Sequence, residues 1–322
     1  MKIFQHANQL LRAKFHEYIV PQKAAFISTM SRSGTWRNRE FFFFFNQLLN
    51  EKTEDQIINE MVAEKKKIQY LVKVNEKIFK LNAFLISHWH CPGFEENYNG
   101  NLKDKWNNLE YYNEEIPTKI RPRTRVFNIN FQFNPYKNKK SKIIFYYRNP
   151  LDQCVALYNA IQKSTNYEMN FYFENQKKKK FQNLEEFIEI AGIDMYLKHF
   201  LSFKLTSDLY PKNLLLLTYE DMVTDPEKNF SIVLKFLELD FLIKKFKKKF
   251  LKALEMSSIE NIKKIEKLYG RSISNSYVKS SDSQIINGKI GNWKNFLKND
   301  SIDLFEKRFR KFNLDIKKFN IK

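Results

Sequence analysis

The sequence predicts an α/β fold in one domain, built on a parallel sheet with helices on both faces. Short and almost wholly apolar runs alternate along the chain with longer stretches of helical pattern, which is the order that a parallel sheet requires. The chain has 322 residues, of which 43% are hydrophobic and 16% aromatic, so it can bury a substantial core.

The charge of the chain raises the question of a polyanionic partner. The net charge is +20 and the isoelectric point is about 9.6. The lysine runs at 65–67, 177–180 and 247–249 are scattered, however, and do not form one basic helix. We interpret them as solvated faces that reflect a coding bias, and we expect no specific nucleic-acid partner. The positive charge would still attract an anionic ligand to the protein.

The cysteines and the distribution of apolar residues limit the cellular compartments in which the protein is expected. The two cysteines, Cys91 and Cys154, lack the spacing of a metal cluster, so we expect neither a zinc module nor a disulfide scaffold. No window holds the roughly 20 apolar residues of a transmembrane helix, and the first 20 residues lack the apolar segment of a signal peptide. These features predict a cytoplasmic protein without a membrane span.

The first predicted elements are an apolar strand at 24–30, a polar loop at 31–35 and a helix over 36–50. The helix contains five consecutive phenylalanines, residues 41–45. Five consecutive residues cover every face of a helix, and a helix that is apolar all round must be buried. We therefore expect this run to anchor the preceding loop in the core.

The later elements follow from caps, breakers and apolar runs. In chain order we expect a helix capped by Thr53, strands at 80–87, 125–133 and 141–147, a helix with Pro150 in its first turn, a helix bent near Gly192, a strand within 213–221, a helix from Asp225-Pro226 to Leu239, lysine-rich helices to Leu268, and a last helix over 300–318.

Distinctive polar residues follow the predicted parallel strands where each strand ends. The four segments are 31–35, 88–93, 148–152 and 219–225. Ligands of open α/β sheets bind outside the carboxyl ends of the strands. The agreement among four strand ends predicts a ligand site at this edge of the sheet.

The loop "SRSGTW" has the composition of an anion site. Gly34 permits a close approach of the backbone, Ser33 and Thr35 carry hydroxyls, and Arg32 carries a guanidinium fork. The Walker A pattern is absent. A strand-to-helix turn without a ligand is the alternative interpretation.

The other strand ends also allow two interpretations each. Arg148 follows a buried strand and needs an anion, which would be either a ligand or the nearby Asp152. His88 or His90 could act as a general base or could be a structural histidine. The later segment "GKIGNWKN" is either a loop that folds over a ligand or a plain surface loop.

Taken in order, these segments resemble the successive signatures of one family. "SRSGTW", "SHWHCPG", "YYRNPLD", "TYEDMVTDPEKNFSIVLKFLEL" and "GKIGNWKN" are similar to motifs of sulfotransferases that use 3'-phosphoadenosine 5'-phosphosulfate (PAPS). The resemblance covers about residues 24 to 296 and is nearest to the soluble bacterial branch. It implies a P-loop-type fold and a single domain over 1–322, with the motifs in a core at 24–298.

The resemblance also implies roles for individual residues. The first loop would cradle the 5'-phosphosulfate, Arg148 would contact the 3'-phosphate, and Tyr219 would lie near the adenine. His88 would remove the proton of the acceptor, and Arg32 would stabilise the leaving group, without a metal. The complete implied cofactor set is Arg32, Ser33, Gly34, Thr35, Trp36, Arg148, Tyr219, Gly288 and Lys289.

The chain departs from the family pattern at several positions. Ala156 stands where the family has a serine, and Ile286 where it has an arginine. Ile86 replaces a frequent lysine, and Trp36 comes one position early for stacking on adenine. Loss of one charged and one neutral contact would weaken cofactor binding by roughly 30- to 1,000-fold. Positions that could compensate are Arg271, Lys279 and Lys289.

Two other functions compete with PAPS-dependent transfer of sulfuryl to a hydroxyl or amine. A P-loop kinase would need an acidic residue such as Asp221 to hold Mg²⁺. A catalytically impaired relative would bind a nucleotide or polyanion, and Ala156 and Ile286 favour it. The acceptor is expected to be a small molecule or a glycan, held by the segments 95–136 and 161–182. The sequence leaves the oligomeric state open.

Overall fold

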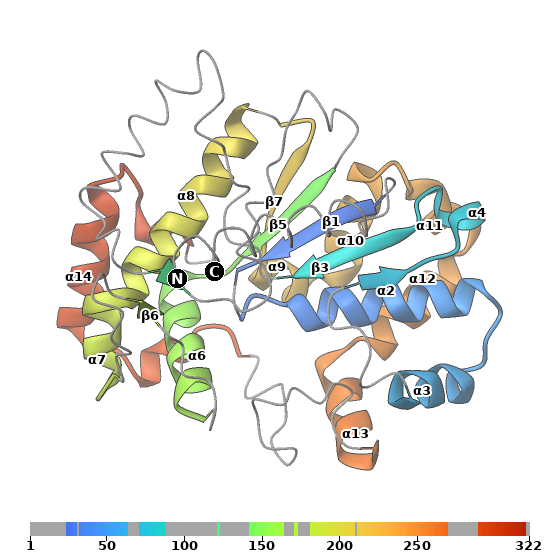
Figure 1. Ribbon diagram of the computed structural model, residues 1–322, viewed down its shortest axis with the longest axis horizontal. Coiled ribbons are helices and arrows are strands. Elements are labelled where there is room, and N and C mark those ends of the chain that lie inside the picture. The colour runs from blue at the N-terminus through green and yellow to red at the C-terminus, as the bar shows by residue number, and fades with distance from the viewer. Residues whose placement is uncertain are drawn as a thin grey trace, which may run out of the picture.

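The computed structural model describes residues 24–30, 32–63, 71–87, 121–122, 142–163, 171–172, 181–209, 211–269 and 289–319. Within these ranges a central sheet lies between two groups of helices (Figure 1). The predicted α/β class is therefore confirmed.

The sheet has five strands in the order β2-β3-β1-β5-β7. Their bounds are β1 (Ala24–Thr29), β2 (Leu71–Lys73), β3 (Ala83–Ser87), β5 (Ile143–Tyr147) and β7 (Leu214–Thr218). Neighbouring strands are parallel, except that β2 pairs antiparallel with β3 at the edge. The four parallel strands, which the sequence predicted, thus have their carboxyl ends at one edge of the sheet. A separate antiparallel pair joins β4 (Arg121–Pro122) and β6 (Phe171–Tyr172).

The helices follow the strands as an α/β order requires. They are α2 (Thr35–Leu49), α3 (Glu54–Ala63), α4 (Glu76–Phe79), α6 (Pro150–Lys163), α7 (Leu184–Phe187), α8 (Ile193–Leu209), α9 (Tyr219–Thr224), α10 (Pro226–Phe236), α11 (Asp240–Lys245), α12 (Lys247–Met256), α13 (Ile259–Tyr269) and α14 (Asn299–Arg310). Short turns add a π-helix at Ile188–Gly192 and 3-10 helices at Asn292–Asn295 and Ile316–Phe319.

Each face of the sheet has its own apolar core. Alternate residues of β1 enter the two cores, since Ile27 packs on the side of α2, α10 and α12, and Phe26 on the side of α6, α8 and α14. In β5, Ile144 and Phe145 divide in the same way. Figure 1 shows the two groups of helices on opposite sides of the strands. This alternation explains why the parallel strands read as continuous apolar runs.

The phenylalanine run of α2 is buried, as predicted, with one exception. Phe41, Phe42, Phe44 and Phe45 have no exposed surface, and Phe43 is only half-buried. The ring of Phe41 stacks on Phe230 of α10 with 3.9 Å between centroids. On another side of the helix, Phe42 stacks on Phe84 of β3 at the same distance. The run therefore fixes α2 between the sheet and α10.

Several predicted boundaries hold for the predicted reason. Pro150 begins α6, and the side chain of Asp225 caps α10 by accepting a hydrogen bond from the Lys228 N–H. The predicted bend near Gly192 is present as the π-helix, where a Cβ on Gly192 would lie 3.0 Å from the Phe187 ring. Glycine is thus needed there for close packing.

Other boundaries differ. The strand predicted within 213–221 ends at Thr218, because the Thr218 side chain accepts a hydrogen bond from the Asp221 N–H and so starts α9. The last helix, predicted over 300–318, ends at Arg310, and a 3-10 turn follows. The strand predicted at 125–133 lies outside the described residues. Of the helices described, none has the length and apolar character to cross a membrane.

Candidate functional site

The first loop leaves β1 and starts α2 in a conformation that depends on glycine. Gly34 is the N-cap residue of α2, with φ of 91°. A Cβ at this position would lie 2.1 Å from Cε of Met222 in α9 and 3.2 Å from the Tyr219 ring. Among the described residues no side chain caps this end of the helix. The first N–H groups of α2 are therefore available to an anion, and the helix dipole favours one there.

The two hydroxyls of this loop differ in their surroundings. The Thr35 hydroxyl is hydrogen-bonded to the Thr29 hydroxyl in β1. Ser33 is fully buried and its N–H donates to the Met30 carbonyl at 3.0 Å, but Oγ has no hydrogen-bond partner in the part of the chain that the structure describes. A buried hydroxyl without a partner costs free energy, and an anionic oxygen at the loop would remove that cost.

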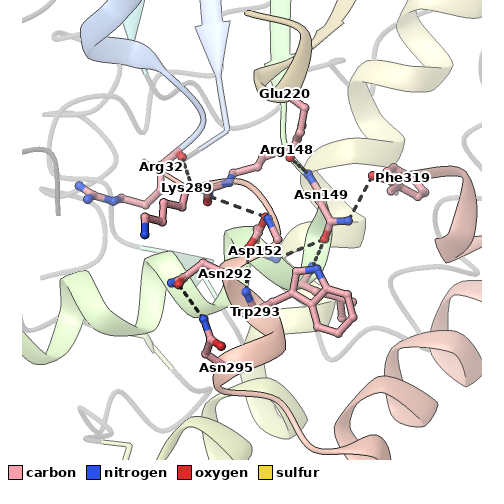
Figure 2. A network of polar contacts seen from close by, with 12 residues as sticks. Arg32, Arg148, Asn149, Asp152, Glu220, Lys289, Asn292, Trp293, Asn295 and Phe319 are labelled. Carbon is pink, nitrogen blue, oxygen red and sulfur yellow. Dashed lines mark hydrogen bonds and ion pairs between the residues drawn. The ribbon is translucent and has the colours of Figure 1, made fainter. Parts of the chain in front are cut away.

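Arg148 follows β5 and joins two segments that are far apart in the sequence. Its Nη1 donates to the Arg32 carbonyl oxygen at 3.3 Å, and its Nη2 donates to the Lys289 carbonyl oxygen at 2.9 Å (Figure 2). The guanidinium carbon lies 4.6 Å from the centre of the Tyr219 ring. Arg148 is only 6% exposed, and its Nε has no partner within the described residues. One donor of the buried fork is thus left for a further acceptor.

Asp152, in the first turn of α6, contacts both Arg148 and the segment after Lys289. The expected ion pair is present, but at 3.9 Å between Arg148 Nη2 and Asp152 Oδ2 it is long. Shorter bonds come from the backbone: the Gly291 N–H donates to Oδ2 at 2.6 Å and the Trp293 N–H donates to Oδ1 at 2.9 Å. The segment "GKIGNWKN" is therefore fastened to α6 by this carboxylate, as Figure 2 shows.

Asn149 connects the same motif to two further segments, a role that the sequence analysis missed. Its N–H donates to the buried carboxylate of Glu220 at 2.9 Å, and its Nδ2 donates to the Phe319 carbonyl oxygen at 3.2 Å. Its Oδ1 caps α6 by accepting from the Leu151 and Asp152 N–H groups. Burial raises the pKa of Glu220, while the hydrogen bond from Asn149 opposes the shift. A signal existed in the sequence, since Glu220 directly follows an apolar strand.

The two aromatic residues of the predicted cofactor set, Tyr219 and Trp36, differ in burial and in their neighbours. Tyr219 is 7% exposed, beside Gly34 and under the guanidinium of Arg148. Burial raises the pKa of its hydroxyl, and the charge of Arg148 partly offsets this. Trp36 is half-buried in the first turn of α2, and the guanidinium carbon of Arg39 lies 4.9 Å from the centre of its ring.

A buried carboxylate one turn into α2 was also missed. Glu40 is 7% exposed, and burial raises the pKa of its carboxyl to about 8, despite the opposing charges of Arg39 and Arg37. The packing of α2 on all sides explains its burial.

The remaining predicted residues are distributed as follows. Ala156 is half-buried on α6, Ile86 is fully buried in β3, and Asp221 accepts a hydrogen bond from the Thr218 hydroxyl at 2.6 Å. Asp221 thus supports the Thr218 cap of α9, and this contact gives no support to a magnesium-binding role. Predicted positions that lie outside the described residues are His88, His90, Arg271, Lys279, Ile286 and Gly288, together with most of 95–136 and 161–182.

The described strand ends therefore bring together the first loop, the segment after β5, the start of α9 and the segment from Lys289 to Asn295. A family model described as the sulfotransferase domain matches residues 22–319. The chain belongs to the sulfotransferase family. The match to 298 of the 322 residues, counted from 22 to 319, agrees with a single domain.

Individual relatives of this sulfotransferase are distant. Amine sulfotransferase of Oryctolagus cuniculus is 23% identical over 237 residues, which is 69% of this chain and 73% of that protein. A crystal structure of retinol dehydratase in complex with androsterone and the inactive cofactor PAP has a TM-score of 0.52 and 16% identity, and covers 91% of this chain and 81% of that one. Mouse sulfotransferase SULT7A1 complexed with PAP has a TM-score of 0.50 and 15% identity, with coverage of 90% and 84%. At these identities the structures establish the shared fold.

Proposed function

We propose that this sulfotransferase takes its sulfuryl group from PAPS and transfers it in line to a hydroxyl or amine. The observation that carries the proposal is the position of Arg148, whose buried guanidinium binds the first loop and Lys289 and keeps one donor for a further acceptor. Support also comes from solved structures of the same fold that are described as complexes with PAP.

The residues of the first loop fit the 5'-phosphosulfate. Within the described residues the N-terminus of α2 has no side-chain cap and the Ser33 hydroxyl has no partner, and both features favour an anionic oxygen at Gly34. Thr35 and Trp36 follow in the first turn of the helix. The proposed roles of Tyr219 and Gly288 rest on the family resemblance.

The proposed 3'-phosphate site differs from the family pattern. Within the described residues the buried Nε of Arg148 has no partner, while Nη1 and Nη2 each donate to a carbonyl oxygen. Ala156 offers no hydroxyl. Lys289, whose side chain is exposed beside this motif, would supply the missing charge. We expect these residues to hold the nucleotide with fewer contacts than the family pattern provides.

The bound donor would supply a sulfuryl group on a good phosphate leaving group. His88 is proposed to accept the proton of the attacking hydroxyl or amine, which increases the nucleophilicity of that atom during attack. Arg32 and the N–H groups at the start of α2 are proposed to stabilise the charge that develops on the leaving phosphate. No metal is required by this scheme.

Calorimetric titration with adenosine 3',5'-bisphosphate tests the donor class. The proposal expects saturable binding, and an absence of heat at millimolar nucleotide would reject it. Heparin binding with a steep salt dependence, in the absence of nucleotide binding, would instead support the catalytically impaired relative. That second candidate is favoured by Ala156 and Ile286, which stand where the family has a serine and an arginine.

The assignment of the base is tested separately with His88→Ala and His90→Ala, each assayed for release of the bisphosphate from PAPS. Turnover should fall by about 100-fold or more for the first variant only. Equal turnover in His88→Ala and the unaltered protein would remove His88 from the mechanism.

The acceptor is proposed to be a small molecule or a glycan carrying a hydroxyl or amine, and the reaction is proposed to be cytoplasmic. The name of the rabbit relative supports an amine, and the androsterone complex of retinol dehydratase supports an apolar small molecule. A panel of amines, sterols and sugars, assayed with PAPS, distinguishes these classes.

A further inference from the structure

We propose that Asp152 is a positioning residue that holds the Gly291–Trp293 turn in place, so that Lys289 contributes its charge to the 3'-phosphate site. The inference rests on the proposed function, because it assigns a task within the same nucleotide site. It gives the site a compensating cation where the family pattern has an arginine and a serine and this chain has Ile286 and Ala156.

The carboxylate of Asp152 is built into this position. It is 2% exposed, and each oxygen accepts one backbone N–H, Oδ2 from Gly291 and Oδ1 from Trp293. Gly291 has φ of 76°, a left-handed conformation that side chains disfavour. Two charge-assisted bonds to residues two positions apart fix the conformation of the turn as well as its location.

Lys289 precedes this turn by two residues and is fixed from its other side by Arg148, which donates to its carbonyl oxygen at 2.9 Å. In Figure 2 the side chains of Lys289 and Arg32 extend to the same side of Arg148, away from Asp152. The turn therefore places a second cation beside the first loop. Without the turn, Lys289 would lose one of the two restraints on its backbone.

If Asp152 acted only through its negative charge, its effect on phosphate binding would have the opposite sign. A carboxylate 3.9 Å from the Arg148 guanidinium reduces the positive potential at an anion site, so its removal should strengthen the binding of a phosphate. If Asp152 acts by positioning, its removal should weaken that binding instead. The sign of the change in affinity separates the two roles.

The experiment uses the full chain and the variant Asp152→Asn, which keeps one acceptor oxygen but turns an NH₂ group towards one of the two backbone N–H groups. The dissociation constants of adenosine 3',5'-bisphosphate and of adenosine 5'-phosphate are measured by calorimetry. We expect bisphosphate binding to weaken by about 10- to 100-fold and monophosphate binding by less than about threefold.

The matched control is Asp194→Asn. Asp194, in α8, is also a buried aspartate, 4% exposed, and it pairs with Arg308 of α14 at 3.3 Å. Its substitution should lower the melting temperature and leave both nucleotide affinities unchanged. A loss of bisphosphate affinity confined to Asp152→Asn would support the inference.

Three outcomes would overturn the inference. They are unchanged or tighter bisphosphate binding by Asp152→Asn, an equal loss for both nucleotides, and equal losses in the two aspartate variants. If the unaltered protein binds neither nucleotide, the proposed function itself fails, and this outcome is distinct because it appears before any substitution.

A second variant, Gly291→Ala, keeps the test decisive if Asp152→Asn does not fold. No described atom lies within 4 Å of a Cβ at Gly291, so alanine would strain the turn through its φ angle alone. The same selective loss of bisphosphate affinity is expected. Unchanged selectivity in a folded Gly291→Ala protein would count against the inference.

Discussion

Arg148 and Lys289 are 141 positions apart, yet Nη2 of the first lies 2.9 Å from the carbonyl oxygen of the second. The same guanidinium also binds the carbonyl oxygen of Arg32 through Nη1. An arginine fork can satisfy two carbonyl oxygens in fixed directions, whereas a lysine ammonium is a single point of charge. The contribution of the forked shape of the Arg148 side chain can therefore be tested separately from the contribution of its charge.

Substitution Arg148→Lys should therefore weaken binding of adenosine 3',5'-bisphosphate although the charge is kept. Losing one charge-assisted bond from a buried group costs about 1.5–3 kcal/mol, or roughly 10- to 150-fold in affinity. Calorimetric titration measures the change. Arg308→Lys, at a partly exposed arginine that pairs with the buried Asp194, is the control and should leave affinity unchanged. Equal affinities of Arg148→Lys and the unaltered protein would show that the two bonds from the Arg148 guanidinium to carbonyl oxygens do not contribute to nucleotide binding.

Substitution Gly34→Ala should damage both stability and nucleotide binding. Alanine in the left-handed region costs about 1–2 kcal/mol, and its Cβ would collide with Cε of Met222. The double variant with Met222→Ala removes the collision and leaves the strain. Denaturant titration of both proteins should show partial recovery in the double variant relative to the sum of the single changes. Full recovery would mean that the backbone is not strained.

The phenylalanine run provides an internal comparison of burial. Phe41→Ala should lower the free energy of unfolding by about 3–5 kcal/mol, because the ring is fully buried and stacks on Phe230. Phe43→Ala should cost roughly half as much or less, since Phe43 is half-buried. Urea unfolding curves of the two variants provide the test. Similar losses for both would contradict the burial pattern of α2.

The buried carboxyl of Glu40 should make stability depend on pH. Burial raises its pKa from 4.5 to about 8, so the folded state retains a proton that the unfolded state releases in this window. Its contribution to stability is complete below pH 4.5 and is lost as the pH rises towards about 8, at a slope of up to about 1.4 kcal/mol per unit.

The variant Glu40→Gln isolates this contribution, because glutamine stays neutral at every pH. Its free energy of unfolding should fall less steeply with pH than that of the unaltered protein. Glu255→Gln, at an exposed position of α12, is the surface control and should follow the unaltered protein. Parallel curves for Glu40→Gln and the unaltered protein would mean that Glu40 is ionised in the folded state.

The sequence was informative where local chemistry determines the structure. Pro150 and Asp225 begin their helices as predicted, and a π-helix ends at Gly192, where the sequence predicted a bent helix. The apolar runs before Arg148 and Tyr219 are both strands, the first almost wholly buried and the second buried at Leu214 and Leu217. In each case the signal lies within a few residues of the element that it predicts.

The contacts that complete the site could not be predicted in this way. Asp152 was one of two anions considered for Arg148, but its shorter bonds go to backbone N–H groups 139 and 141 positions away. Backbone donors leave no trace in the sequence of side chains. The burial of Glu40 likewise depends on which helices surround α2, and no local pattern determines that packing.

The separation of these partners along the chain has a consequence for folding. Arg148 binds a residue 116 positions before it and another 141 positions after it, and Asn149 binds Phe319, 170 positions away. Such contacts close long loops, whose entropy must be lost before the bonds form, so we expect them to form late in folding. A folding intermediate that lacks the docked 289–319 segment could contain the whole sheet and still lack this network. Nucleotide binding followed during refolding would then report on the last step and not on the collapse of the core.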